Sequence, residues 1–292
     1  MVNLRLKLPV DFLNEEDRCG YTVTQKMKEI WAVELDLFAE FDRVCRKHGI
    51  KYVASGGTML GAVRHHGFIP WDDDMDLMIM RDEYDKLCKI ASEEFKEPYF
   101  FQSVDTDKEY LRAFARLRNS ETTAIQPIDE QLFPNSNMGI FIDIFPLDHV
   151  ADNKALYNFQ IFQYKLFHKP FYDLSCYLIK HHLPSSLGLS LNSFARWLYV
   201  RSQKILKKYN SFDTEYVSLI SFQPNNLTHA LHQTDMEDLI EMDFEFMKIP
   251  VPANFDDHLK RKYGDYMTPV KSPNYHGEVE FDTNVSYKIK RK

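Results

Sequence analysis

Several features that define other classes of protein are missing from this sequence of 292 residues. Its four cysteines lie far apart and never form a C-x-x-C pair, which excludes a cysteine zinc site and a dithiol redox motif. It has no uninterrupted run of about 18 apolar residues, so no transmembrane helix is predicted. Its first residues, MVNLRLKLPVDF, lack the apolar segment of a signal peptide. We therefore expect a cytoplasmic protein with reduced thiols.

Charge is unevenly distributed along a chain whose net charge is −7. Between residues 154 and 208, nine Lys and Arg accompany a single acid, Asp173, so this aromatic-rich segment carries +8 and the remainder −15. A basic, aromatic segment is typical of contact with an anionic surface, here the inner membrane face. The alternative is a helical subdomain whose long basic side chains simply extend into solvent. We expect no nucleic-acid partner.

The most informative stretch is SGGTMLGAVRHHGFIPWDDDMDLMI, residues 55–79. Four of its last eight residues are aspartates: Asp72, Asp73, Asp74 and Asp76. In a strand, Asp72, Asp74 and Asp76 would share one face and Asp73 would point the other way. Carboxylates this close repel one another unless a cation lies among them, and clustered oxygen ligands suit Mg²⁺ or Mn²⁺. The alternative is a solvated acidic turn.

A second acidic position lies in GIFIDIFPL, residues 139–147, which has the composition of a buried strand. A single carboxylate, Asp143, stands in its middle, and a buried charge is rarely tolerated without a partner. A role as a third metal ligand, contributed by a neighbouring strand, supplies that partner. Asp148, which follows a Pro-Leu pair, is expected at a turn or a helix cap.

Residues around the aspartates are candidates for substrate binding. Gly56, Gly57 and Thr58 stand where a short strand gives way to a helix, so their backbone can approach a phosphate. Arg64 could clamp a phosphate or simply end that helix as an exposed cation. Trp71 could stack on a base or face a quaternary ammonium, with plain packing as the alternative.

Two further cations alternate with apolar residues in the predicted strand from residue 111. Arg116 and Arg118 would lie on one face of this strand. They could hold a polyphosphate, or they could pair with the surplus acids. We count both among the candidate substrate-binding residues.

Three separated motifs resemble the LicD phosphocholine-transferase family of the nucleotidyltransferase superfamily, to which fukutin-type proteins are related. They are GGTMLGAVRHHGFIPWDDDMDL, FIDIFPLD and YGDYMTP. The resemblance implies an α+β fold with a nucleotidyltransferase-like mixed sheet flanked by helices, plus a helical subdomain. We expect a catalytic core in residues 1–150, a helical basic insertion in 151–248 and a C-terminal segment, 249–292, that packs back on the core.

The resemblance also implies a reaction. It is the metal-dependent transfer of phosphocholine from CDP-choline to a sugar hydroxyl of a teichoic-acid or surface-polysaccharide precursor, which is expected to be lipid-linked. Asp74 and Asp76 match the family's Asp-x-Asp ligands, Asp143 matches the third acid, and Gly56 and Gly57 match the phosphate-binding turn. Sixteen residues separate Gly57 from Asp74, more than in the general superfamily pattern but similar to LicD proteins.

The proton of the acceptor hydroxyl would pass to a carboxylate, and we favour Asp143 over Asp74. Three other interpretations remain open at this point. The enzyme could transfer another CDP-activated phospho-alcohol or a nucleotidyl group. The chain could instead be a nucleotide-binding module with a degenerate site, or a metal-independent sheet protein with an acidic turn.

Overall fold

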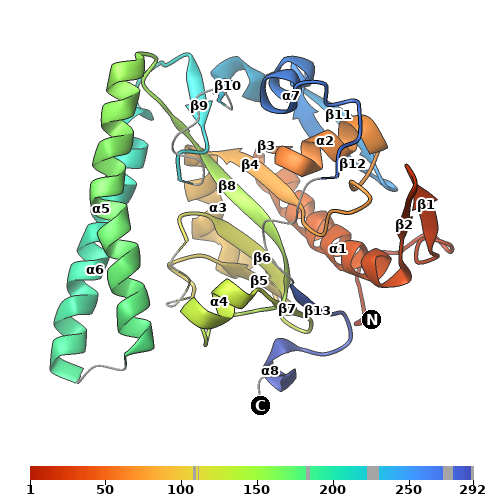
Figure 1. Ribbon diagram of the computed structural model, residues 1–292, viewed down its shortest axis with the longest axis horizontal. Helices are drawn as coiled ribbons and strands as arrows, with labels where there is room; N and C mark the ends of the chain where they lie inside the picture. Colours follow the sequence, from red (N-terminus) through yellow and green to blue (C-terminus); the bar gives the residue numbers. More distant parts are fainter. Residues whose placement is uncertain (108–109, 111, 182–184, 222–229, 272–278, 291–292) are drawn as a thin grey trace.

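The computed structural model describes residues 1–107, 110, 112–181, 185–221, 230–271 and 279–290. Its described residues contain a seven-stranded mixed sheet in the order β10-β9-β8-β4-β3, in which β6 also pairs with β8 and β5 with β6. The strands are β3 (Tyr52–Ala54), β4 (Asp76–Met80), β5 (Tyr99–Gln102), β6 (Ala115–Asn119), β8 (Ile140–His149), β9 (Tyr216–Ser218) and β10 (Leu231–His232). Helices flank this sheet (Figure 1), which confirms the predicted fold class.

Strand β8 is the centre of the sheet, and all ten of its residues are buried. Strand β4 runs parallel to it, whereas β6 and β9 pair with it antiparallel. A parallel pair needs a long crossover, and here helix α3 (Arg81–Glu94), strands β5 to β7 and helix α4 (Pro127–Leu132) supply it. The parallel register places Asp76 opposite Asp143.

Helix α1 (Gln25–His48) has a residue type typical of a helix end at each of its boundaries. The Thr24 hydroxyl accepts a hydrogen bond from the backbone N–H of Met27, and Gly49 ends the helix with φ +63°. Its apolar face, which includes the fully buried Trp31, joins the main hydrophobic core. Helix α2 (Gly56–His65) follows β3 directly, so that its first residues lie beside the start of β4.

The region 151–248 is only partly helical. Helices α5 (Lys154–Lys180) and α6 (Ser185–Leu206) lie side by side at one edge of the molecule (Figure 1), and a short 3-10 turn, η1, covers Lys207–Tyr209. The chain then returns to the sheet through β9 and β10. A hairpin of β11 (Leu239–Phe244) and β12 (Met247–Pro252) follows and contacts β3. The predicted helical insertion therefore ends near residue 209, because apolar residues beyond it complete the sheet.

The described residues after 252 include a helix and a short strand. Helix α7 (Phe255–Tyr263) ends before Gly264, and β13 (Glu280–Asp282) pairs with β7 (Thr123–Ile125). The remaining elements are β1 (Glu16–Arg18), β2 (Tyr21–Val23), η3 (Gln233–Met236) and α8 (Tyr287–Lys290). Within the described ranges, no helix combines the length and apolarity needed to cross a membrane.

Asp148 is not at a turn or a helix cap, in contrast to the sequence expectation. It lies in β8 with a fully buried side chain, and Arg81 at the start of α3 donates to both of its oxygens at 2.8 and 2.7 Å. This buried bidentate pair fixes α3 against the central strand. Its partners lie 67 residues apart, which is why local sequence patterns do not reveal it.

Candidate active site

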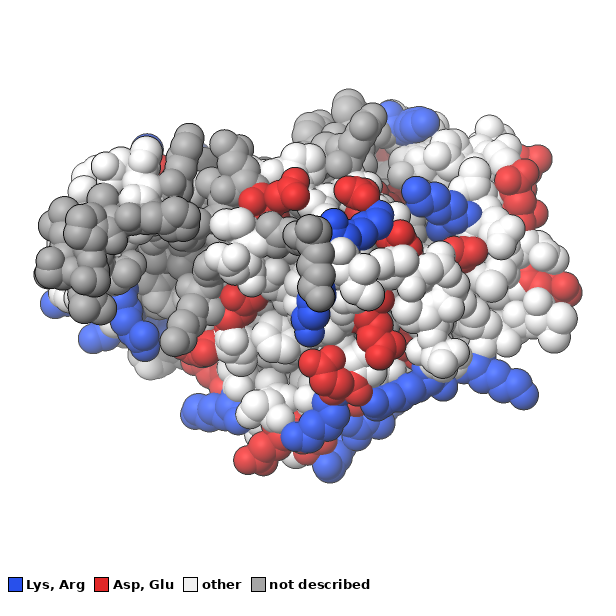
Figure 2. All heavy atoms as spheres, turned by 90° about the horizontal axis from the view of Figure 1, so that it is seen from below, with Lys and Arg blue, Asp and Glu red and all other residues white. Residues whose placement is uncertain are grey.

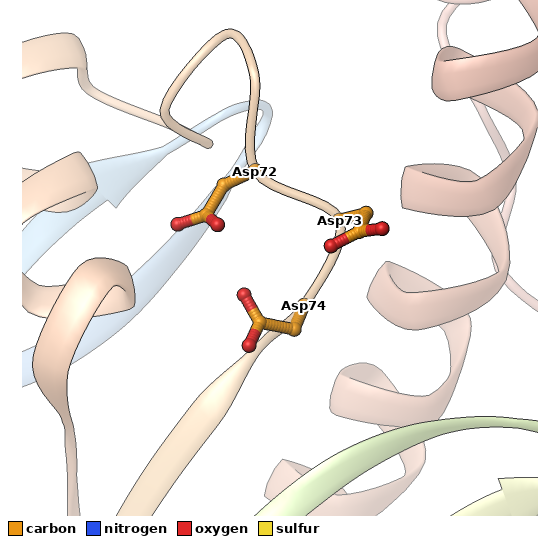
Figure 3. A group of neighbouring side chains, drawn as sticks. All are labelled: Asp72, Asp73 and Asp74. Atoms are coloured by element: carbon orange, nitrogen blue, oxygen red, sulfur yellow. The ribbon is translucent and has the colours of Figure 1, made fainter. Parts of the chain in front are cut away.

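The aspartates before β4 form a loop and not the strand face that the sequence predicts. Strand β4 begins at Asp76, and residues 72–75 have irregular structure. In this loop Asp72, Asp73 and Asp74 each place a carboxylate oxygen within 4.8 Å of the others (Figure 3). The Trp31 indole nitrogen donates to the backbone oxygen of Asp72 at 2.9 Å and so ties the loop to α1. Because of this loop conformation, the Asp73 carboxylate lies with those of Asp72 and Asp74 and does not point away from them.

Asp76 and Asp143 meet across the parallel strands β4 and β8. They are register partners, and the Asp143 N–H donates to the Met75 backbone oxygen at 2.9 Å. Asp143 also lines a small hollow together with Asp73, Asp74, Gln126 and three apolar side chains, Phe141, Val279 and Phe281. The structure thus brings together the three carboxylates that the sequence singled out, Asp74, Asp76 and Asp143.

A further carboxylate reaches this group from helix α1. Glu34 is 1% exposed, and its Oε2 atom has no hydrogen-bond partner among the described residues. Burial raises the pKa of Glu34 well above its usual value, and Asp74, Asp73 and the other loop aspartates raise it further. Glu34 could not be identified from the sequence, because it is one of five acids in helix α1 and carries no local sign of its partners.

The electrostatics of the group show an excess of negative charge. Burial, followed by the charge of Asp74, raises the pKa of Asp72 well above its normal range. Burial also raises the pKa of Asp76, with Asp74 and Asp143 as the next contributors. In addition, the Gln126 Oε1 atom, beside the hollow, is buried and lacks a hydrogen-bond partner in the described structure. Oxygen ligands with this surplus charge fit a hard divalent cation.

One cation approaches Asp76 from the C-terminal helix α7. A Cβ atom built on Gly56 would lie 3.4 Å from Asp76 Oδ2 and 3.6 Å from the Lys262 amino group, which places that lysine beside the aspartate. Burial lowers the pKa of Lys262, although Asp76 opposes the shift. Lys262 could not be identified from the sequence, because the charged i,i+4 pairs of α7 are typical of an exposed helix.

Gly57 and Thr58 shape the aspartate loop. A Cβ on Gly57 would lie 2.6 Å from Asp72 Oδ2, so any larger residue at this position would force the Asp72 carboxylate to turn away. The Thr58 hydroxyl accepts a hydrogen bond from the Asp76 N–H at 2.8 Å. Gly56 has φ +51°, a conformation that favours glycine. The Thr58 hydroxyl therefore has a hydrogen-bond partner within the protein, whereas the sequence predicts that Thr58 binds substrate.

The two arginines predicted to bind substrate are buried among protein groups. Arg116 donates to Asp143 at 2.6 Å and to Asp129 at 2.8 Å, so pairing with acids, the alternative interpretation, describes it correctly. Arg118, 1% exposed, donates to Gln102 and to the backbone oxygen of Gly139. Because both guanidiniums are enclosed, they are not positioned to hold a polyphosphate. They instead hydrogen-bond to protein groups next to the site.

The Asp129 carboxylate in helix α4 is shared by a cluster of three arginines. Asp129 pairs with Arg112 and Arg116, and the Nη2 atom of Arg118 lies 4.0 Å from the Oδ2 atom of Asp129. Burial alone would raise the pKa of Asp129, but the three arginines hold that pKa at about 2. Arg116 therefore links a permanently charged network to Asp143.

The other two candidates lie at the edge of the site. Arg64 donates to the backbone oxygen of Tyr266 at 2.6 Å and to the His65 ring at 2.9 Å. Half-buried Trp71 packs edge-to-face against Tyr21, with ring centroids 5.9 Å apart. Arg64 thus connects helix α2 to the segment after α7, and Trp71 has the packing role that the sequence left open.

A mixed sheet that gathers carboxylates from neighbouring strands beside a glycine turn defines a nucleotidyltransferase-like site. Residues 49–171 match the family model described as LicD/FKTN/FKRP, nucleotidyltransferase domain. The chain is also 26% identical, over 82% of its length and 91% of the relative's, to the lipopolysaccharide cholinephosphotransferase LicD of Haemophilus influenzae. An uncharacterised protein of Rickettsia prowazekii is 36% identical over 27% of each chain. Residues 49–171 therefore match the LicD nucleotidyltransferase domain, which confirms the resemblance that the sequence motifs indicate.

Proposed function

We propose that this protein transfers phosphocholine from CDP-choline to a sugar hydroxyl of a teichoic-acid or other surface-glycan precursor. The observation that carries the proposal is the convergence of Asp74, Asp76 and Asp143 from two adjacent parallel strands and the loop before one of them. The similarity to a lipopolysaccharide cholinephosphotransferase supports phosphocholine as the transferred group and a glycan as the acceptor.

The acidic group fits Mg²⁺ or Mn²⁺, with Asp74, Asp76 and Asp143 as the proposed ligands and Asp72 and Asp73 within reach of the same space. When bound there, a divalent ion would neutralise charge on the donor diphosphate and on the departing CMP. The raised pKa of the buried Glu34, to which the neighbouring aspartates contribute, reflects a negative field that favours a cation at this position. The chain's own residues account for the other parts of the reaction.

The transfer breaks the bond between the phosphocholine phosphorus and the bridging oxygen of CMP, and it forms a bond from that phosphorus to the acceptor oxygen. Lys262 provides a positive charge beside Asp76, where the phosphates of the donor would lie. The acceptor hydroxyl loses its proton to a carboxylate, for which Asp143 is the candidate because Arg116 holds its Oδ1 atom at 2.6 Å and so fixes its orientation.

The direct test measures CMP release from CDP-choline with Mg²⁺ or Mn²⁺ by wild type, Asp76→Asn and Asp82→Asn. Asp82 is an exposed residue of helix α3 and serves as a matched control. Turnover that depends on metal, disappears in Asp76→Asn and persists in Asp82→Asn supports the proposal. CDP-ethanolamine, CDP-ribitol and CTP are assayed in parallel.

The outcomes separate the remaining interpretations. Preferred turnover of another CDP-alcohol would keep the site and replace choline. Pyrophosphate release from CTP would identify a nucleotidyl transfer instead. Metal-dependent binding of CDP-choline without turnover in the presence of glycan acceptors would point to a binding module, and absence of binding would reject the proposal.

A further inference from the structure

The helical hairpin α5–α6 presents large apolar side chains to solvent. Seven of them, on both helices, are between 42% and 61% exposed: Leu156, Phe159, Phe162, Leu166, Phe194, Trp197 and Val200. On α5 they follow each other at three- and four-residue steps, opposite the face that carries buried Tyr157, Ile161 and Tyr164. A contiguous apolar stripe of this kind usually marks a contact surface.

Three cations lie next to this stripe, in a groove between the two helices. The groove measures about 270 Å³ and is lined by Gln163, Phe167 and Ile205 together with Arg201, Lys204 and Lys208. In the part of the chain that the structure describes, none of these three cations takes part in an ion pair. Two other cations of residues 154–208, Lys169 and Lys207, do pair, with Asp173 and Asp85.

Aromatic rings connect the groove to the exposed stripe. The Lys208 amino group lies 5.9 Å from the Phe159 ring, and the Arg201 guanidinium lies 5.4 Å from the Trp197 ring. Trp197 in turn contacts Phe167 and Phe194, with ring centroids 5.8 Å apart in both cases. We define the hairpin face as the seven exposed apolar residues named above together with Phe167, Arg201, Lys204 and Lys208.

The charge of the hairpin face selects its partner. Residues 154–208 carry +8, whereas the rest of the chain carries −15. On the underside of the core, by contrast, acidic and basic side chains are interspersed (Figure 2). Exposed rings with adjacent, unneutralised cations match the boundary of an anionic bilayer, where aromatic groups lie at headgroup level and basic groups contact phosphates. A second copy of the same face would oppose these cations with like charge.

We propose that the hairpin face docks on the surface of a bilayer that contains anionic phospholipids. Phe159, Phe162 and Trp197 insert at the level of the headgroups, and the cations of the groove contact lipid phosphates. The contact is interfacial and reversible. It stands independently of the proposed transfer reaction, although it would bring the active site to a membrane that holds lipid-linked acceptors.

The test uses the intact protein and vesicles of phosphatidylglycerol and phosphatidylcholine in equal amounts, with phosphatidylcholine vesicles for comparison. Of the three tryptophans, Trp31 is fully buried and Trp71 is half-buried, so Trp197, which is 46% exposed, reports contact through its fluorescence. We expect co-sedimentation and a blue shift only with anionic vesicles. Both effects should weaken at 1 M salt, where charges are screened within about 3 Å.

The decisive variant is Arg201→Gln/Lys204→Gln/Lys208→Gln. Since each basic group near an anionic surface contributes about 1 kcal/mol, we expect the partition coefficient to fall on the order of a hundredfold. The matched control replaces three exposed lysines outside the hairpin, Lys26, Lys51 and Lys89, by Gln and should retain binding within a few-fold. Circular dichroism of both variants verifies that they are folded.

Three results would overturn the proposal. They are equal partition into vesicles with and without anionic lipid, unchanged partition of the hairpin variant, and a concentration-dependent dimer that shields Trp197 before vesicles are added. The last result would assign the hairpin face to a second copy of the chain. CMP release with a water-soluble acceptor does not depend on docking, so a failure of this proposal remains distinguishable from a failure of the proposed reaction.

Discussion

The active centre contains clustered negative charge in an enclosed site, whereas the hairpin α5–α6 contains clustered positive charge at the surface. In the active centre, Asp76, Asp143 and Glu34 are crowded and largely enclosed, and glycines and strand register hold the group in place. On the hairpin, Arg201, Lys204 and Lys208 are unpaired among the described residues and lie beside exposed rings. Enclosed charge of one sign predicts a small ion or substrate as the partner, whereas exposed charge beside apolar surface predicts a large one.

Asp76→Asn should separate function from stability most strongly. We expect CMP release to fall on the order of a thousandfold, because a metal-facing carboxylate is lost from the proposed ligand set. The same change should leave the melting temperature in EDTA equal to or above that of wild type, since it removes one of several mutually repelling carboxylates. Calorimetry with and without Mn²⁺ checks this, and a large loss of stability in EDTA would contradict it.

Asp148→Asn is the matching substitution at a carboxylate with a structural partner, and it should have the opposite effect. It leaves the buried Arg81 without its counter-charge, and breaking a buried pair in this way costs about 3–5 kcal/mol of the free energy of unfolding. Urea unfolding measures the loss. The control is Asp82→Asn, next to Arg81 in helix α3. Equal stability of the two variants would refute the role of the pair.

Gly57→Ala tests whether the aspartate loop needs its close approach to α2. The added methyl group would meet Asp72 Oδ2 at 2.6 Å, so the Asp72 carboxylate must rotate away, at a cost of about 1 kcal/mol and with a fall in kcat. Gly20→Ala is the control, because Gly20 has φ +73° and no atom within 4 Å of a built Cβ. That variant should lose about 1–2 kcal/mol of stability with kcat unchanged.

The hairpin should show its own dependence on pH through His168 in α5. Burial lowers the pKa of His168 to about 4, and its Nδ1 atom has no hydrogen-bond partner in the described structure. Below the unfolded pKa of about 6.5 only the unfolded state binds the proton, so stability is lost as the pH falls from 6.5 towards 4, by about 2 kcal/mol at pH 5.

His168→Phe should remove this part of the pH dependence while it preserves packing against Tyr164 and Phe171. His181→Phe, at an exposed position, is the control and should behave as wild type. Urea midpoints at pH 7 and pH 5 measure the difference. A His168→Phe variant that loses as much stability between these pH values as wild type would rule out His168 as the source.

The sequence predicts those parts of the structure that depend on neighbouring residues. Thr24 and Gly49 are residue types typical of helix ends and delimit helix α1, and the composition of residues 139–147 indicates the buried strand. Spacing within the chain could not predict partners that are distant in sequence. Arg116 pairs with Asp143 27 residues away, and Arg81 pairs with Asp148 across 67 residues.

The active centre shows the same division between local and distant information. The aspartate motif can be recognised from a few neighbouring residues of the sequence. In the structure its first residues form a loop and not a strand, where the Trp31 indole binds the Asp72 backbone and Gly57 leaves room for the Asp72 side chain. Glu34 and Lys262 carry no local signal, since Glu34 is one of several acids in helix α1 and Lys262 is one of several cations in helix α7. Only the folded sheet brings them to Asp76.

The parallel pairing of β4 with β8 also determines when, during synthesis, the site can form. Asp76 has no register partner until Asp143 has left the ribosome, and Lys262 arrives only after the hairpin and β9 have been made. A nascent chain that ends before helix α7 therefore holds its carboxylates without their neighbouring lysine. The complete centre is among the last features to assemble, and a truncated chain lacks it even where its sheet has folded.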